Sequence, residues 1–202
     1  MKPGIAANTA YNFIGSFLTY FAGIALLPMM VRYMGLAQFG LYSMISIFSV
    51  TGFIYLIEMG FQSSVIKYTA EYAAHNDNKR LGQLASSVTI LFLCLGLIVG
   101  IVGFFSLGWL IQLLNVPLAE QPQLTFALKV TFATYVFGFP ALIATGVLQG
   151  LHEFKAQKAI ETLFVMIRVL GTILILMEGY GLSELVVFTS ILQVAQCFSL
   201  FG

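Results

Sequence analysis

The residues of this sequence that could do chemistry are a few charged side chains within long apolar stretches, and Arg168 is the clearest of them. A charge deep in a membrane costs at least about 2.5–3.5 kcal/mol on insertion scales, so it usually faces a bundle interior or a watery cavity and has a partner. The forked donors of a guanidinium suit phosphates and carboxylates. Arg168 is therefore predicted either to bind an anionic ligand or to form an ion pair, with Glu161 on the same helical face or with Glu58.

Three more charged residues lie in or beside apolar stretches. Glu58 is predicted to be either a protonatable coupling group or a carboxylate partner for Arg168 or Lys67. Arg32 and Lys129 are expected near one membrane surface, where a long apolar stem lets the charged end reach water. For these two residues, both this snorkelling interpretation and contact with a substrate stay open.

A polar stripe marks the first apolar stretch. Asn8, Asn12, Ser16 and Thr19 follow at spacings of four, four and three residues, which places them on one face of a helix. Such a stripe should face away from lipid, so it either lines a cavity or forms hydrogen bonds to a neighbouring helix. The length of the stripe favours the cavity.

Catalytic and metal-binding patterns are missing from the sequence. No serine stands in a nucleophile-elbow sequence, no group of His and Cys has metal-ligand spacing, and no Gly-rich loop leads into Lys followed by Ser or Thr. Cys94 and Cys197 are interpreted as buried, unpaired thiols, and His75 and His152 as solvated loop residues. The sequence therefore predicts neither an enzyme nor a cofactor.

The amino-acid composition indicates that the segments carrying these residues lie in a membrane. Hydrophobic residues make up 59% of the chain and charged residues 8%, with a mean hydropathy of +0.96, against roughly a quarter charged in soluble domains. A membrane helix needs about 20 apolar residues, and the long runs lack the alternation of barrel strands, so an all-α membrane protein is predicted. The uncharged runs are 3–31, 33–57, 81–119, 130–151 and 185–202. A net charge of +1 without a basic stripe predicts no nucleic-acid partner.

Polar segments divide the chain into six predicted membrane helices. These are placed at about 8–31, 39–66, 84–114, 125–149, 158–177 and 184–202. Residues 76–78 are expected to end a cytoplasmic extension of the second helix. The pairs Gly96 with Gly100 and Gly146 with Gly150 are predicted to be close-packing sites, because small residues let helix backbones approach.

The distribution of Lys and Arg predicts the orientation. Basic residues are retained in cytoplasmic loops, and a cytoplasmic N-terminus places most of them on that side. The cytoplasmic set would be Lys2, Lys67, Lys79, Arg80, Lys155 and Lys158, and the outer set would be Arg32 and Lys129. The chain is therefore predicted to be a multi-pass protein of the cytoplasmic (inner) membrane with its N-terminus in the cytoplasm.

Three groups of short motifs carry a resemblance to a known family. The string PMMVRYMG at residues 28–35 is followed by FGLY at 39–42, and EMGF at 58–61 is followed by KYTAEY at 67–72. The third group is LQGLHEFKA at residues 148–156. In order and spacing these motifs resemble Wzx-like lipid-linked oligosaccharide flippases, the polysaccharide-transporter branch of the multidrug/oligosaccharidyl-lipid/polysaccharide exporter superfamily.

The resemblance implies a V-shaped transporter of about 12 to 14 helices, in which two bundles surround a central cavity. Residues 1–202 would form its N-terminal six-helix bundle, with the second bundle absent and the chain truncated. The implied function is to flip polyprenyl-diphosphate-linked oligosaccharide across the membrane for surface polysaccharides such as O-antigen. The implied partners are the lipid bilayer, this lipid-linked substrate and polysaccharide-assembly machinery. The candidate cavity residues are Arg168, Glu58, Glu161, Asn8, Asn12, Ser16, Arg32 and Lys129.

Other functions stay open at this point. A cation-coupled drug or metabolite antiporter of the same superfamily should have a cavity dominated by carboxylates and aromatic rings, and Arg168 argues against it. A non-transporting membrane scaffold or a membrane-embedded enzyme such as a polymerase forms a third class. Such an enzyme should carry acid or base residues on a large outer loop, whereas the outer loops predicted here do not exceed about a dozen residues.

Overall fold

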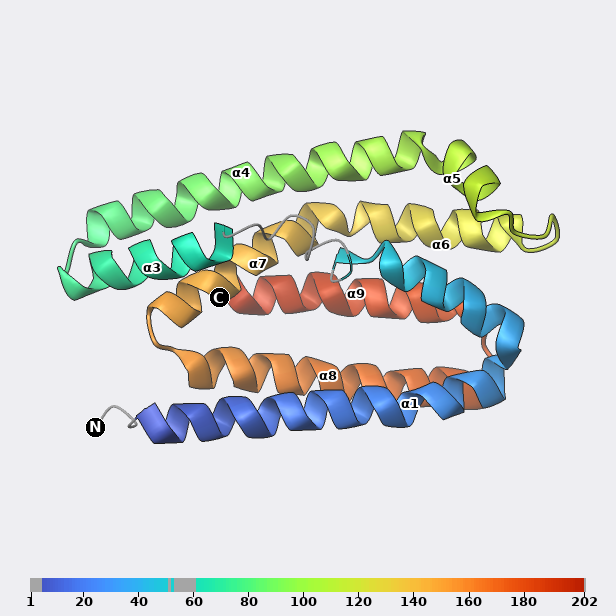
Figure 1. Ribbon diagram of the computed structural model, residues 1–202, viewed down its shortest axis with the longest axis horizontal. Helices are drawn as coiled ribbons and strands as arrows, with labels where there is room; N and C mark the ends of the chain where they lie inside the picture. The colour runs from blue at the N-terminus through green and yellow to red at the C-terminus, as the bar shows by residue number, and fades with distance from the viewer. Residues whose placement is uncertain (1–4, 51, 53–60, 202) are drawn as a thin grey trace.

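The structure is a computed structural model that describes residues 5–50, 52 and 61–201 (Figure 1). These residues form helices joined by short turns, so the predicted all-α class is confirmed. The helices are α1 (Ile5–Ile47), α3 (Phe61–Ala74), α4 (Asn78–Phe105), α5 (Leu107–Leu114), α6 (Gln121–Ala133), α7 (Tyr135–Gly150), α8 (Phe154–Met177) and α9 (Leu182–Phe201).

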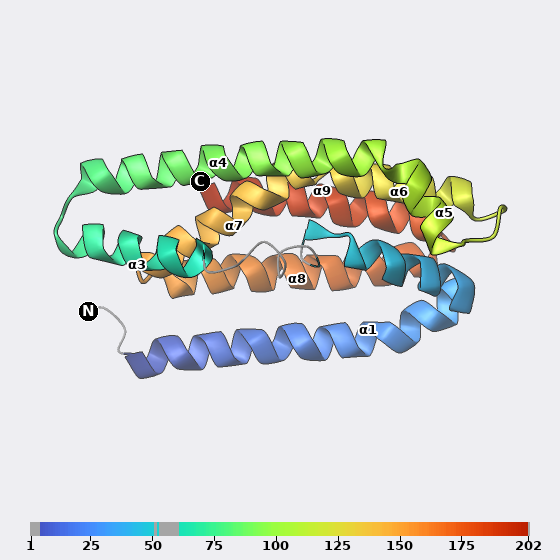
Figure 2. The ribbon, with the colours of Figure 1, turned by 45° about the horizontal axis from the view of Figure 1, so that its top comes forward.

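Helix α1 consists of two arms that meet at a bend. Gly35 interrupts the helix with a φ of 79° and a ψ of 165°, a conformation that residues with a Cβ rarely adopt. The chain changes direction there, as both ribbon views show (Figures 1 and 2). The first arm, residues 5–34, corresponds to the helix predicted at 8–31, and the second arm covers residues 36–47.

The helix predicted at 39–66 differs from the structure. Its start lies in the second arm of α1, which ends at Ile47, and its end lies in α3, which begins at Phe61. The hydroxyl of Ser49 donates to the Ser46 carbonyl at 2.7 Å and accepts from the N–H of Gly52 at 3.2 Å. Side-chain bonds of this kind compete with the regular helix ladder. Residues 51 and 53–60 lie outside the described residues.

Four described helical segments are long and apolar enough to cross a membrane, namely Gly23–Ile47, Asn78–Phe105, Phe154–Met177 and Leu182–Leu200. Helices α6 and α7 meet at a bend of 44° and would add a fifth span if they count as one. The protein is therefore a multi-pass membrane protein. The helix predicted at 84–114 is divided between α4 and α5, and the total of six spans stays a prediction.

The helices pack in layers with α9 in the middle. In both views α1 and α8 run side by side, α4 lies on the opposite side, and α6, α7 and α9 lie between them (Figures 1 and 2). Helix α9 contacts α6, α7 and α8, whereas α4 contacts α7, α3 and α6. The α6–α7 pair therefore separates α4 from the α1–α8 side of the molecule.

Glycines allow the backbones around α7 to touch. A Cβ added at Gly96 of α4 would lie 2.5 Å from the backbone oxygen of Tyr135, and one added at Gly100 would be similarly crowded by α6. On the other side of α7, a Cβ at Gly150 would lie 2.5 Å from the Cβ of Thr69 in α3. The predicted close-packing role is confirmed at these glycines.

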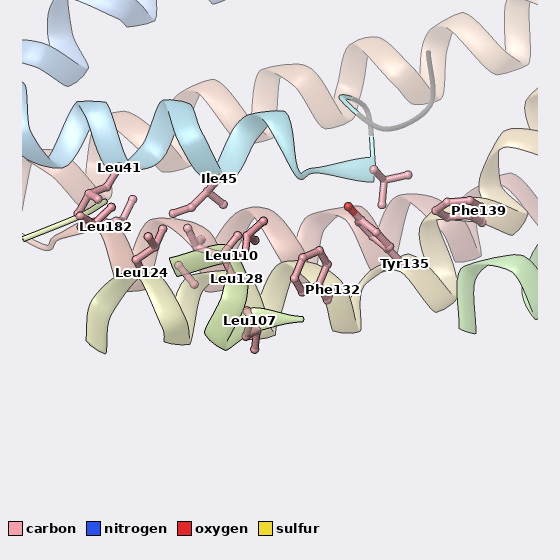
Figure 3. Packing of buried hydrophobic residues seen from close by; sticks show 14 of the residues in the cluster. Leu41, Ile45, Leu107, Leu110, Leu124, Leu128, Phe132, Tyr135, Phe139 and Leu182 are labelled. Carbon is pink, nitrogen blue, oxygen red and sulfur yellow. The ribbon is translucent and has the colours of Figure 1, made fainter. Parts of the chain in front are cut away.

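A hydrophobic core forms where α6 and α7 meet the second arm of α1 and α5 (Figure 3). Leu124, Leu128 and Tyr135 are fully buried there. The Tyr135 hydroxyl donates a hydrogen bond to the backbone carbonyl of Phe48, so burial leaves no unsatisfied hydroxyl. This contact fixes α7 against the end of the second arm and thereby positions one wall of a cavity.

Candidate functional site

A cavity of about 410 Å³ lies between the second arm of α1, the α6–α7 pair, α8 and α9, and we call it the Arg168 cavity. Its volume lies within the usual range for small-molecule sites. The polar residues that line it are Tyr42, Ser46, Ser49, Thr131, Thr134, Thr145, Lys158, Glu161, Arg168, Thr189, Ser190, Gln193 and Gln196.

Most of these polar residues carry hydroxyls or amides, and apolar side chains such as Ile45, Val50 and Leu142 lie between them in the wall. The hydroxyls of Thr131, Thr134, Thr145 and Thr189 donate to backbone carbonyls of their own helical segments. A hydroxyl oxygen has two lone pairs, so each of them can still accept a hydrogen bond from a ligand. The wall can therefore form many hydrogen bonds to a polyhydroxylated molecule.

Arg168 supplies a positive charge from the middle of α8. Its Nε is buried and has no hydrogen-bond partner among the described residues. An unsatisfied donor of a charged group is costly to bury. The residue also lines the cavity, and its fork of guanidinium donors suits the oxygens of a phosphate group.

Glu161 is bonded within α8 instead of to Arg168. One of its oxygens lies 2.9 Å from the Nζ of Lys158, and the other accepts from the Nε2 of Gln157 at 2.8 Å. In the part of the chain that the structure describes, the alternative of an Arg168–Glu161 pair is thus replaced by a pair with Lys158. The reason is geometric, because Lys158 stands one turn from Glu161 and Arg168 stands two turns away.

Three other predicted residues lie away from the Arg168 cavity. Ser16 is half-buried on the first arm of α1, and Arg32 is exposed near the bend of that helix. Lys129 is exposed on α6 beside α4, and its Nζ lies 5.7 Å from the centroid of the Phe104 ring. Of the eight predicted residues, the structure brings Arg168 and Glu161 together in this cavity.

The side chains of the remaining predicted residues lie outside the part of the chain that the structure describes. Glu58 lies outside the described residues, and so do the side chains of Asn8 and Asn12. The cavity role of the polar stripe and the coupling role of Glu58 both stay predictions.

The contribution of α9 to the site was not predicted from the sequence. Thr189, Gln193 and Gln196 line the cavity together from that helix. Their spacings of four and three residues place them on one helical face. The available signal was a polar stripe inside the uncharged run 185–202, the same kind of signal as the stripe of the first helix.

These features agree with the family comparison. A family model described as "Polysaccharide biosynthesis protein" matches residues 5–201. The chain belongs to the polysaccharide biosynthesis protein family. The resemblance to Wzx-like transporters is thereby confirmed, and the family is one of membrane transporters of polysaccharide precursors that are usually not enzymes. Comparison with curated proteins and with solved structures gives no significant match.

Proposed function

We propose that this bundle is one half of a flippase that moves polyprenyl-diphosphate-linked oligosaccharide across the cytoplasmic membrane. The charge of Arg168, whose Nε has no partner among the described residues, in a cavity that also presents hydroxyls and amides carries this proposal. The substrate has the complementary chemistry, since its diphosphate oxygens can accept hydrogen bonds from a guanidinium and its sugars present many hydroxyls. Membership of the polysaccharide biosynthesis family supports the same substrate class.

The proposed binding mode uses Arg168 for the diphosphate and the α9 amides for the sugars. Charge-assisted hydrogen bonds are roughly twice as strong as neutral ones, so Arg168 would hold the head of the substrate. Gln193 and Gln196 can both donate and accept, which suits sugar hydroxyls in either orientation. Two bundles that rock about the bound substrate would expose it alternately to the two sides.

The proposed orientation places the N-terminus and the α3–α4 and α7–α8 connections in the cytoplasm, in line with the positive-inside rule. Lys158 and Glu161 then stand between the cytoplasmic end of α8 and Arg168. A substrate that enters from the cytoplasm would pass this neutral pair before its diphosphate reaches the guanidinium. The exported sugars would pass to outer-leaflet assembly machinery for surface polysaccharides such as O-antigen.

The alternative of a cation-coupled drug antiporter has less support. Such a cavity should be rich in carboxylates and aromatic rings. In the lining that the structure describes, the carboxylate is Glu161, which is paired with Lys158, and the aromatic ring is Tyr42. A wall of hydroxyls and amides is better suited to carbohydrate than to an apolar cation.

Substitution of Arg168 tests the proposal in cells that depend on this transporter for surface polysaccharide. Arg168→Lys keeps the charge and removes the planar fork, so it should export polymer partially, whereas Arg168→Ala should fail. Both variants should reach the membrane at near-normal abundance. Arg32→Ala is the matched control, because Arg32 is exposed outside the cavity. Normal export by Arg168→Ala at normal abundance would contradict the proposed role.

A further inference from the structure

A second concave surface lies between α4 and the α6–α7 pair, on the side away from the Arg168 cavity. This groove, called the Lys129 groove below, has a volume of about 250 Å³. Leu97, Ile101 and Phe104 of α4 line it from one side, and Ala133 and Val136 line it from the other. Except for Lys129 its lining is apolar, so it cannot satisfy the hydroxyls of a sugar.

The groove has the shape of a channel along the helix axes. Helices α4 and α6–α7 run in opposite directions (Figure 1), so Phe104 and Lys129 mark one end and Leu97 and Val136 mark the other. The distance from Leu97 to Phe104 is two turns of α4, about 10 Å. The small side chain of Ala133 leaves room between the larger side chains. An extended hydrocarbon chain fits such a channel.

Lys129 lacks an acidic partner on the elements that form the groove. The run 81–119, which includes α4 and α5, contains no charged residue, and residues 121–152 contain no Asp or Glu. The Nζ of Lys129 lies 5.7 Å from the centroid of the Phe104 ring, in the last turn of α4. A cation beside apolar surface at the end of a membrane helix attracts an anionic lipid head group.

We infer that the Lys129 groove binds an anionic phospholipid, with its phosphate at Lys129 and one acyl chain along α4. The end of the groove at Phe104 lies close to the helix end, at the level of head groups, and the groove then descends into the bilayer. Charge complementarity selects an anionic amphiphile, and the open apolar wall selects a single chain of the surrounding lipid. The inference does not depend on the transported substrate.

Photocrosslinking of the protein in phosphatidylcholine vesicles tests this inference. The probe is phosphatidylglycerol with a diazirine in one acyl chain, and crosslinked peptides are mapped by mass spectrometry. Adducts should fall on Leu97, Ile101 and Val136. Lys129→Gln should lower their yield about five-fold, the factor expected from one basic contact near a lipid surface. Lys129→Arg should retain the yield.

Two control variants separate the groove from general attraction by charge. Arg32→Gln removes an exposed cation of α1 and should leave the adducts on α4 unchanged. Ala133→Phe, at an exposed position, should block the chain and remove the adducts while Lys129 is kept. If this variant does not fold, the Lys129 pair still decides the question.

Three results would overturn the inference. Equal yields with a diazirine-labelled phosphatidylcholine probe would remove the role of lipid charge. Unchanged yields in Lys129→Gln would remove the role of the lysine. Loss of the adducts on addition of excess undecaprenyl diphosphate would assign the groove to a polyprenyl chain instead of a bilayer phospholipid.

Discussion

The Arg168 cavity and the Lys129 groove lie on opposite sides of the α6–α7 pair, and each holds a cation without an acidic partner among the described residues. The walls differ, because hydroxyls and amides alternate with apolar side chains around Arg168, whereas the lining around Lys129 is hydrocarbon. The two side chains also differ, since a guanidinium offers a planar fork and an ammonium is a point charge. If both proposals hold, the wall around each cation selects between a sugar-linked diphosphate and a lipid head group.

The largest expected effect comes from a comparison of two single variants, in which either Arg168 or Lys129 is replaced by leucine. Arg168→Leu should lower export by at least about tenfold, because a hydrogen bond to a charged group contributes about 1.5–3 kcal/mol. Lys129→Leu should change export by no more than about two-fold, as for a substitution outside the substrate site. Surface polysaccharide per transporter in the membrane is the measurement. Equal losses in the two variants would erase the functional distinction between the two regions.

The next expected effect is on stability, and it tests the packing of α4, the helix that forms one side of the Lys129 groove. Gly96→Ala should destabilise the protein by about 1–3 kcal/mol, because the new Cβ collides with the backbone oxygen of Tyr135 and forces α4 away from α7. Gly82→Ala on the same helix meets nothing within 4 Å, so it should be neutral or stabilising by up to about 1 kcal/mol. Thermal unfolding in detergent measures both. If the two variants have the same Tm, α4 does not pack against α7 as closely as the structure shows.

The sequence predicted those features whose cause is local. The low content of charge and the long apolar runs predicted an all-α membrane protein, and residues 76–78 predicted the turn between α3 and α4. The cost of a charge in lipid indicated that Arg168 faces a cavity or a partner, and the structure places it in a cavity wall. Gly96 and Gly150 were identified because close approach requires a small residue wherever it occurs.

Features that depend on tertiary packing could not be predicted in this way. Which face of α9 meets the cavity depends on how α6, α7 and α8 surround that helix, so Gln193 and Gln196 were missed. Two other features were missed although their causes are local. Lys158 stands one turn from Glu161 on α8 and pairs with it, and the bonds of Ser49 to residues three positions away interrupt the predicted helix at 39–66.

A smaller effect is expected from the amide wall. Gln193→Leu should lower export about two- to tenfold, because a neutral hydrogen bond contributes about 0.5–1.5 kcal/mol. Gln112→Leu is the matched control, since Gln112 is exposed on α5 and does not line the Arg168 cavity. The measurement is again surface polysaccharide per transporter in the membrane. An unchanged Gln193→Leu variant would mean that the sugars do not touch α9.

The smallest expected effect is the coupling between charges inside the Arg168 cavity. The Lys158 and Glu161 side chains are only 19% and 26% exposed, so a double-mutant cycle of Lys158→Met and Glu161→Gln should give a coupling of about 1 kcal/mol. A cycle of Arg168→Leu and Glu161→Gln should be additive within about 0.5 kcal/mol, because Glu161 already has its partner. Thermal unfolding of the single and double variants in detergent measures both cycles. A larger coupling for Arg168 than for Lys158 would make the guanidinium a structural partner of Glu161. The cavity would then lack a free cation, and its difference from the Lys129 groove would be one of wall polarity alone.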